Sequence, residues 1–267
     1  MALRSALINV MTAAARRAAR SLLRDFGEVE QLQVSMKGPA DFVSAADRRA
    51  EDTIRTELKK ARPGYGFLLE ERGVEEGVDT SNRWLIDPLD GTTNFLHGIP
   101  HFSISIALER DSRLFAGVIY DPIRDEMFWA EHGAGAYVNE TRLRVAARQH
   151  IEDAVVVTGI PHRGRGGKEG YLRQLHAMME TVSGVRRFGS AALDLAWVAA
   201  GRFDGYWEQG LKPWDLAAGI VLVREAGGIA SEVGGGAAML ASGSILCANP
   251  VLHGKFVDVF RRAGASA

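Results

Sequence analysis

The sequence predicts an α+β protein in which helices are layered on two sheets. Three observations predict this fold class. Two helical patterns open the chain, a stretch with a period near two runs from residue 102 to about residue 145, and the second half alternates short apolar runs with helical patterns. An antiparallel first half followed by a mixed second half is expected to pack as alternating layers of sheet and helix.

Helical periodicity defines the first two elements. Apolar residues at helical spacing between Leu7 and Leu22 predict a helix that buries one stripe. A second helix is predicted over residues 47–60, and Pro63-Gly64 closes it. The N-terminal stretch carries arginines and no acid, as transit peptides do, but it is poor in serine, so a structural helix is favoured.

Short apolar runs predict the strands of the first half. Residues 66–69 and 84–86 are typical of buried strands, and both runs are followed by carboxylates. The second strand is expected to stop at Asp87-Pro88, because proline cannot donate to a sheet ladder. Alternation then predicts an antiparallel meander with strands over residues 103–106, 116–120 and 126–130.

The second half alternates strands with helices. Strands are predicted over residues 154–158, 203–208, 229–233 and 244–247, and helices over residues 168–182, 190–200, 214–226 and from 251 onward. No stretch has the composition of a flexible linker. Residues 1–267 are therefore predicted to form a single domain with sub-halves of about 1–146 and 147–267.

The composition excludes several classes of protein. With 46% hydrophobic and 24% charged residues, the chain is neither disordered nor collagen-like nor a coiled coil. A net charge of −1 gives no global field for nucleic acid, so a nucleic-acid partner has no support from composition. The single Cys247 cannot form an intrachain disulfide, and no apolar run approaches the ~18 residues of a membrane span. A cytoplasmic protein is expected.

The segment from Trp84 to Phe95 carries the most informative chemistry. Asp87 and Asp90 lie three residues apart in a tight turn and would repel each other unless a cation lies between them. Mg²⁺ accepts hard oxygen ligands of this kind. The alternative is an Asx turn, in which each carboxylate caps backbone amides.

Further acidic positions strengthen the metal hypothesis. Glu70 and Glu71 follow the predicted strand 66–69, and Asp215 lies in the first turn of an almost wholly apolar helix. Capping of the helix is the simpler explanation for Asp215, because the helix dipole favours a carboxylate there. Because the rest of this helix is buried, the carboxylate of Asp215 is nevertheless expected to face a functional site and not bulk water.

Taken together, these motifs resemble the inositol monophosphatase family, and most closely its bacterial extragenic-suppressor type. The runs 84–95 and 214–228 resemble the two hallmark motifs of the family. Residues 37–47 resemble its N-terminal metal loop, and residues 189–194 and 206–208 resemble its substrate-binding segments. The resemblance extends essentially end to end. It implies a layered αβαβα sandwich of the sugar-phosphatase type, dependence on Mg²⁺, sensitivity to lithium and a homodimer.

The resemblance also implies a role for each matching residue. The metal ligands would be Glu70, Asp87, the Leu89 carbonyl, Asp90 and Asp215, which would hold two Mg²⁺ ions and support a weaker third. The catalytic residues would be Lys37, Asp47, Glu70 and Thr92, with Thr92 and Asp47 orienting the attacking water. The substrate would contact Asp90, Gly91, Thr92, Gly189, Ser190, Ala191, Glu208 and Asp215. Glu71 is an alternative to Glu70, because the sequence around this pair departs from the family pattern.

The activity that the resemblance implies is hydrolysis of inositol 1-phosphate to myo-inositol and phosphate by metal-activated water. The alternatives within the enzyme class are fructose-1,6-bisphosphate, NADP, histidinol phosphate and a 3′-phosphoadenylate as substrates. An alternative outside it is a regulatory role with RNA or the transcription machinery. A non-catalytic binder would not need the acids and Thr92 together, so their joint presence favours catalysis.

Overall fold

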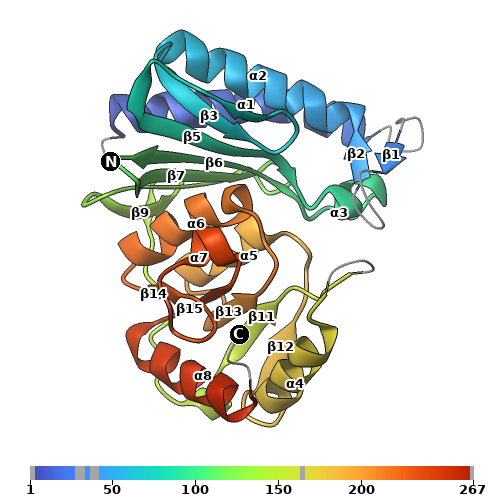
Figure 1. Ribbon diagram of the computed structural model, residues 1–267, viewed down its shortest axis with the longest axis vertical. Coiled ribbons are helices and arrows are strands. Elements are labelled where there is room, and N and C mark those ends of the chain that lie inside the picture. Colours follow the sequence, from blue (N-terminus) through green and yellow to red (C-terminus); the bar gives the residue numbers. More distant parts are fainter. Residues whose placement is uncertain (1–3, 28–33, 37–41, 163–165, 265–267) are drawn as a thin grey trace.

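Helices and sheets alternate in five layers (Figure 1). The computed structural model describes residues 4–27, 34–36, 42–162 and 166–264. Helices α1 (Ala6–Phe26) and α2 (Ala45–Ala61) cover one face of an eight-stranded sheet. Helices α5 (Ala191–Ala199) and α6 (Pro213–Glu225) lie between this sheet and a five-stranded sheet, whose other face carries α4 (Lys168–Met179) and α8 (Pro250–Arg262). The predicted αβαβα fold is confirmed.

The N-terminal pattern forms a helix that buries one stripe, as predicted. The Ser5 hydroxyl caps α1 by accepting a hydrogen bond from the Ile8 amide at 3.1 Å. Ile8, Met11 and Leu22 are fully buried in the core between α1, α2 and the first sheet. Within the described residues, no helix is long and apolar enough to cross a membrane.

The first sheet contains the predicted meander. Its strands run in the order β10-β9-β8-β7-β6-β5-β3-β4, with β3 parallel to β5 and the other pairs antiparallel. The strands are β3 (Tyr65–Leu69), β4 (Gly73–Glu75), β5 (Asp79–Asp90), β6 (Ser103–Arg110), β7 (Arg113–Asp121), β8 (Glu126–Glu131), β9 (Gly135–Val138) and β10 (Thr141–Arg142).

The predicted end of the metal-motif strand is wrong. Strand β5 continues past Asp87-Pro88 to Asp90. The register against β6 shifts between Asp87 and Asp90, and Pro88 falls in this irregular stretch without a Cα partner. The strand tolerates proline because the irregularity removes the need for its missing N–H. The short helix α3 (Thr92–Leu96) then begins after Gly91, whose φ of 96° favours glycine.

The second sheet is mixed, as predicted. Its order is β12-β11-β13-β15-β14, with β11 parallel to both neighbours and β15 antiparallel to both of its own. The strands are β11 (Val155–Thr158), β12 (Gly184–Arg186), β13 (Gly205–Glu208), β14 (Ile229–Ser231) and β15 (Ile245–Ala248). Two short helical turns, η2 (Ile151–Asp153) and α7 (Met239–Ser242), complete this half.

Some short elements were not expected from the sequence. The strands β1 (Val34–Met36) and β2 (Phe42–Ser44) form a separate antiparallel pair, and β4 and β12 lie at edges of the two large sheets. Each of these four strands has three residues, which is too short for a period of two to be recognised.

Helix α6 packs unusually close to its neighbours. A Cβ atom at Gly117 of β7 would lie 2.6 Å from the Ala218 carbonyl oxygen, and a Cβ atom at Gly219 would lie 2.4 Å from the Leu195 side chain of α5. Both positions therefore require glycine. The close packing fixes the position of α6 and therefore of Asp215 in its first turn.

Candidate active site

The turn at the end of β5 holds two carboxylates, of which Asp87 is buried and Asp90 is partly buried. One Asp87 oxygen accepts a hydrogen bond from the Leu89 amide at 2.9 Å, which is the Asx turn that the sequence left open. One Asp90 oxygen accepts from the Ser190 hydroxyl at 2.6 Å and from the Ala192 amide at 2.8 Å. These contacts fix both carboxyl groups, one of them by way of α5.

Helix α6 brings Asp215 to the same place. One Asp215 oxygen accepts from the Lys212 amide at 2.8 Å, so the carboxylate does cap the helix. The Trp214 carbonyl accepts from the Ser105 hydroxyl at 3.1 Å, and Ser105 is the β6 partner of Asp87 in the sheet. Asp215 therefore both caps α6 and faces the turn at the end of β5.

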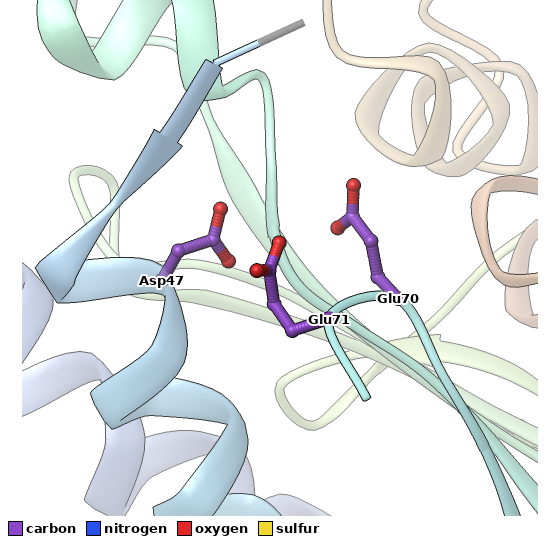
Figure 2. Close-up of side chains that lie close together, drawn as sticks. All are labelled: Asp47, Glu70 and Glu71. Atoms are coloured by element: carbon purple, nitrogen blue, oxygen red, sulfur yellow. The ribbon is translucent and has the colours of Figure 1, made fainter. Parts of the chain in front are cut away.

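A third acidic group comes from the residues that follow β3. Asp47 at the start of α2 and the neighbouring Glu70 and Glu71 each place a carboxylate oxygen within 4.8 Å of the other two. Figure 2 shows the three side chains close together. Glu71 is held toward α2, because its amide donates to Glu51 at 2.8 Å and its carboxylate lies 3.7 Å from Arg48. Glu70 lines the same cavity as Asp87 and Asp90, and Glu71 does not, which supports Glu70 as the metal ligand.

Burial and the repulsion between these acids both raise the pKa of their carboxyl groups, and burial has the larger effect. Burial, followed by the charges of Glu70, Asp90 and Asp215, raises the pKa of Asp87 well above its usual value. Burial and the Asp215 charge raise the pKa of Asp90 to about 7, against the hydrogen bond from Ser190. A bound cation removes this penalty, and the donors are the hard oxygen atoms that Mg²⁺ prefers. The residues therefore fit a divalent metal site.

Most of the predicted site residues surround one cavity of about 390 Å³. Those that line it are Glu70, Asp87, Leu89, Asp90, Gly91, Thr92, Gly189, Ala191, Glu208 and Asp215. Asp47 lies beside Glu70 without lining the cavity, and Ser190 is buried behind it as a donor to Asp90. Lys37 lies outside the described residues.

Thr92 and Glu208 both line the cavity, and each makes one hydrogen bond that fixes its side chain. The Thr92 hydroxyl donates to the Leu89 carbonyl at 2.9 Å, so its lone pairs remain available to a further donor. Glu208 accepts from the Tyr206 hydroxyl at 2.7 Å. A Cβ atom at Gly159 would lie 1.9 Å from the Glu208 carboxylate, so any larger residue there would displace that carboxylate.

Several cavity residues were not assigned a site role from the sequence. They include Asn94, Gly159, His162, Lys212 and Trp214. The Asn94 amide donates to the His101 and Phe188 carbonyls, both at 2.8 Å, and so links the two halves of the cavity wall. Asn94 had a signal in the sequence, because it lies within the run 84–95. Gly159 and His162 had none.

Comparison with known proteins identifies the family. The model of the inositol monophosphatase family matches residues 3–265. The chain belongs to the inositol monophosphatase family. The protein is therefore a phosphatase and a hydrolase. The family match agrees with the two hallmark motifs at residues 84–95 and 214–228.

Similar proteins cover nearly the full length of this family member. The inositol-1-monophosphatase of Mesorhizobium japonicum is 61% identical over 250 residues, with 94% of each chain covered. The Nus factor SuhB of Vibrio cholerae is 41% identical, with 98% of each chain covered. The crystal structure of the extragenic suppressor protein suhB from Bartonella henselae is similar with a TM-score of 0.94 and 54% identity, over 97% of this chain and 99% of that one.

Proposed function

We propose that the protein is a Mg²⁺-dependent phosphomonoesterase that hydrolyses inositol 1-phosphate to myo-inositol and phosphate. The observation that carries the proposal is the convergence of Glu70, Asp87, Asp90 and Asp215, from three separate segments, on one cavity. The 61% identity to an inositol-1-monophosphatase supports the choice of substrate.

The acidic residues and the Leu89 carbonyl would hold the metal. Two Mg²⁺ ions there would polarise the phosphoryl group and stabilise the leaving alkoxide, and a weaker third ion would lie near Glu70. Ser190, Ser105 and the Lys212 amide keep the carboxylates in place before any ligand binds. This preorganisation is what lets a site stabilise developing charge.

The remaining residues would position water and the alcohol. We assign Thr92, Glu70 and Asp47 to the attacking water, because the Thr92 hydroxyl is fixed on Leu89 and keeps free acceptor capacity. We assign Glu208, Gly189 and Ala191 to the alcohol, because a carboxylate accepts hydrogen bonds from ring hydroxyls. Lys37 would act on the phosphate side.

A substrate panel at fixed Mg²⁺ tests the choice of substrate. We expect the highest kcat/KM for inositol 1-phosphate among this compound, fructose-1,6-bisphosphate, NADP, histidinol phosphate and a 3′-phosphoadenylate. Glu208→Gln should lower kcat/KM for inositol 1-phosphate while sparing p-nitrophenyl phosphate, which has no ring hydroxyls. A higher kcat/KM for another member of the panel would replace inositol 1-phosphate as the substrate.

A second role has support from one comparison. The relative from Vibrio cholerae bears the name Nus factor, so an additional regulatory role with RNA or the transcription machinery is the alternative function. A pull-down with wild-type protein and with the Asp87→Asn variant separates the two roles. Capture of transcription proteins by both forms would establish a binding role that does not depend on the metal site.

The family also suggests three properties of the whole protein. We infer a homodimer, inhibition by lithium and a cytoplasmic location. Sedimentation, inhibition curves with LiCl against KCl, and cell fractionation test them in turn.

A further inference from the structure

A second and larger cavity lies away from the candidate active site. Its volume is about 970 Å³, and it shares no lining residue with the candidate active site. It is formed by the turn between β6 and β7, the C-terminal half of α6, and α7. Cavities of this size accommodate small organic ligands.

The cavity combines apolar walls with arginines. The apolar side chains that line it are Leu114, Phe115, Ile220, Val221, Met239 and Leu240. Arg110, Arg113 and Arg224 line it as well, together with the exposed His132. Within the part of the chain that the structure describes, the Arg113 and Arg224 side chains are exposed and form no hydrogen bond or ion pair.

The turn between β6 and β7 fixes two of these arginines. Arg110 and Arg113 are paired across it, and the residues between them, Asp111 and Ser112, have φ angles of 49° and 59°. The Arg110 guanidinium lies 3.9 Å from the centre of the Phe115 ring and donates to Asn82 at 3.1 Å. Arg110 is therefore held flat on an apolar wall, which is a favourable cation–π arrangement.

The acidic residues at the cavity offset only part of this positive charge. Glu225 accepts hydrogen bonds from the Gly133 amide at 3.0 Å and from the Gly135 amide at 2.9 Å, and lies 3.6 Å from His132. Its carboxylate is thus used to hold the turn between β8 and β9. Asp111 is exposed in its own turn, so three guanidinium groups face two carboxylates, one of which is already engaged.

We propose that this cavity binds a small amphipathic anion, with the apolar body on Phe115 and Leu240 and the anionic group between Arg113 and Arg224. Apolar walls favour removal of the ligand's hydrocarbon from water. Exposed guanidinium groups without partners are suited to a carboxylate or sulfonate, because arginine binds such groups through paired hydrogen bonds.

The test uses the full chain and two probes of this chemistry. Titration with 8-anilinonaphthalene-1-sulfonate should give saturable fluorescence at one probe per chain, and decanoate should displace it. Arg113→Ala/Arg224→Ala should weaken probe binding at least tenfold. Arg173→Ala in α4 is the matched control, because Arg173 is also exposed and lies outside the cavity, and it should bind like wild type.

A steric variant and a neutral competitor complete the experiment. Ala241→Trp, at an exposed α7 position that lines the cavity, should also abolish binding. Decanol should compete at least tenfold more weakly than decanoate. Circular dichroism melting curves identify any variant that does not fold. Equal binding by the double variant and Arg173→Ala, failure to saturate at one probe per chain, or equal competition by decanol would overturn the proposal.

Discussion

Individual hydroxyl groups fix the residues around the acidic cavity through hydrogen bonds. Ser190 donates to Asp90, Ser105 donates to the Trp214 carbonyl beside Asp215, and Thr92 donates to the Leu89 carbonyl. The first two contacts join separate segments that the repulsion of the carboxylates would otherwise push apart, and the third fixes the turn between β5 and α3.

Thr92→Ala removes a hydroxyl that we assign to the attacking water. We expect kcat to fall by about a hundredfold or more, the lower end of what positioned proton-transfer groups contribute. The melting temperature should change little, because Thr92 is only partly buried. Thr92→Ser keeps the hydroxyl and should retain most activity in a steady-state phosphate-release assay. Equal losses in the two variants would show that the methyl group, and not the hydroxyl, matters.

Asp215→Asn separates the two roles of this side chain. Asparagine still offers an oxygen to the Lys212 amide, so the helix cap remains, but the charge is lost. We expect Mg²⁺ affinity, measured by isothermal titration calorimetry, to fall at least tenfold and kcat to fall with it. Unchanged Mg²⁺ dependence would show that Asp215 is only a cap.

His101 makes stability depend on pH. Burial, together with the charges of Arg124 and Arg187, lowers the pKa of His101 from 6.5 to about 4. The centre of the His101 ring lies 5.3 Å from the centre of the Phe188 ring and 5.1 Å from that of Trp197. Between these pH values the unfolded chain binds a proton that the folded chain does not. Stability is therefore lost as the pH falls from about 6.5 toward 4.

His101→Phe keeps a ring and removes the titration. The difference in melting temperature between wild type and this variant should shift in favour of the variant as the pH is lowered from 7 to 4. Melting curves at half-unit intervals measure it. Parallel curves would mean that His101 does not titrate differently in the folded and unfolded states.

Among the helices and strands, the position of α6 depends on the close contact between its backbone and Gly117 of β7. The sequence predicted α6 closely, over residues 214–226 against the observed Pro213–Glu225, because its apolar run is long. Its depth against the sheet was not predictable, because that depends on Gly117, which lies far away in the chain on β7. The length of β5 was also missed, because a proline in a strand is normally a stop and only the register shift against β6 permits it.

Gly117→Ala tests whether this close packing sets the site. A methyl group would overlap the Ala218 carbonyl, so we expect a loss of about 1–3 kcal/mol of stability. Mg²⁺ binding should also weaken, because α6 carries Asp215. Gly254→Ala in α8 is the control, since nothing lies within 4 Å of its added Cβ atom. That variant should gain about 0.5–1 kcal/mol in urea unfolding. Equal stability of the two variants would contradict the account.

At the scale of the whole molecule, the sequence predicted the acids but not all of their surroundings. The hallmark runs name Asp87, Asp90 and Asp215, whose spacing and context are local. The cavity wall at Gly159 and His162 is assembled only by the packing of the two sheets, and no local pattern marks it. The contact between Ser190 and the substrate stays a prediction, and the hydrogen bond from its hydroxyl to Asp90 was not foreseen from the sequence.

The layered fold explains why distant acids meet. Strand β5 ends in Asp87 and Asp90, the residues after β3 supply Glu70, and α6, placed between the two sheets, begins with Asp215. Because β3 and β5 are parallel neighbours, their carboxyl ends lie together at one edge of the first sheet. The start of α6 then closes the group from the other side.

We propose that these carboxylates hold Mg²⁺ for phosphate hydrolysis. The most direct measurement is phosphate release from inositol 1-phosphate by protein stripped with excess chelator and then titrated with Mg²⁺. We expect no release in the stripped protein and full recovery on adding Mg²⁺, with Asp87→Asn failing to recover at the concentrations that restore wild type. Substantial hydrolysis that survives exhaustive chelation would contradict the account.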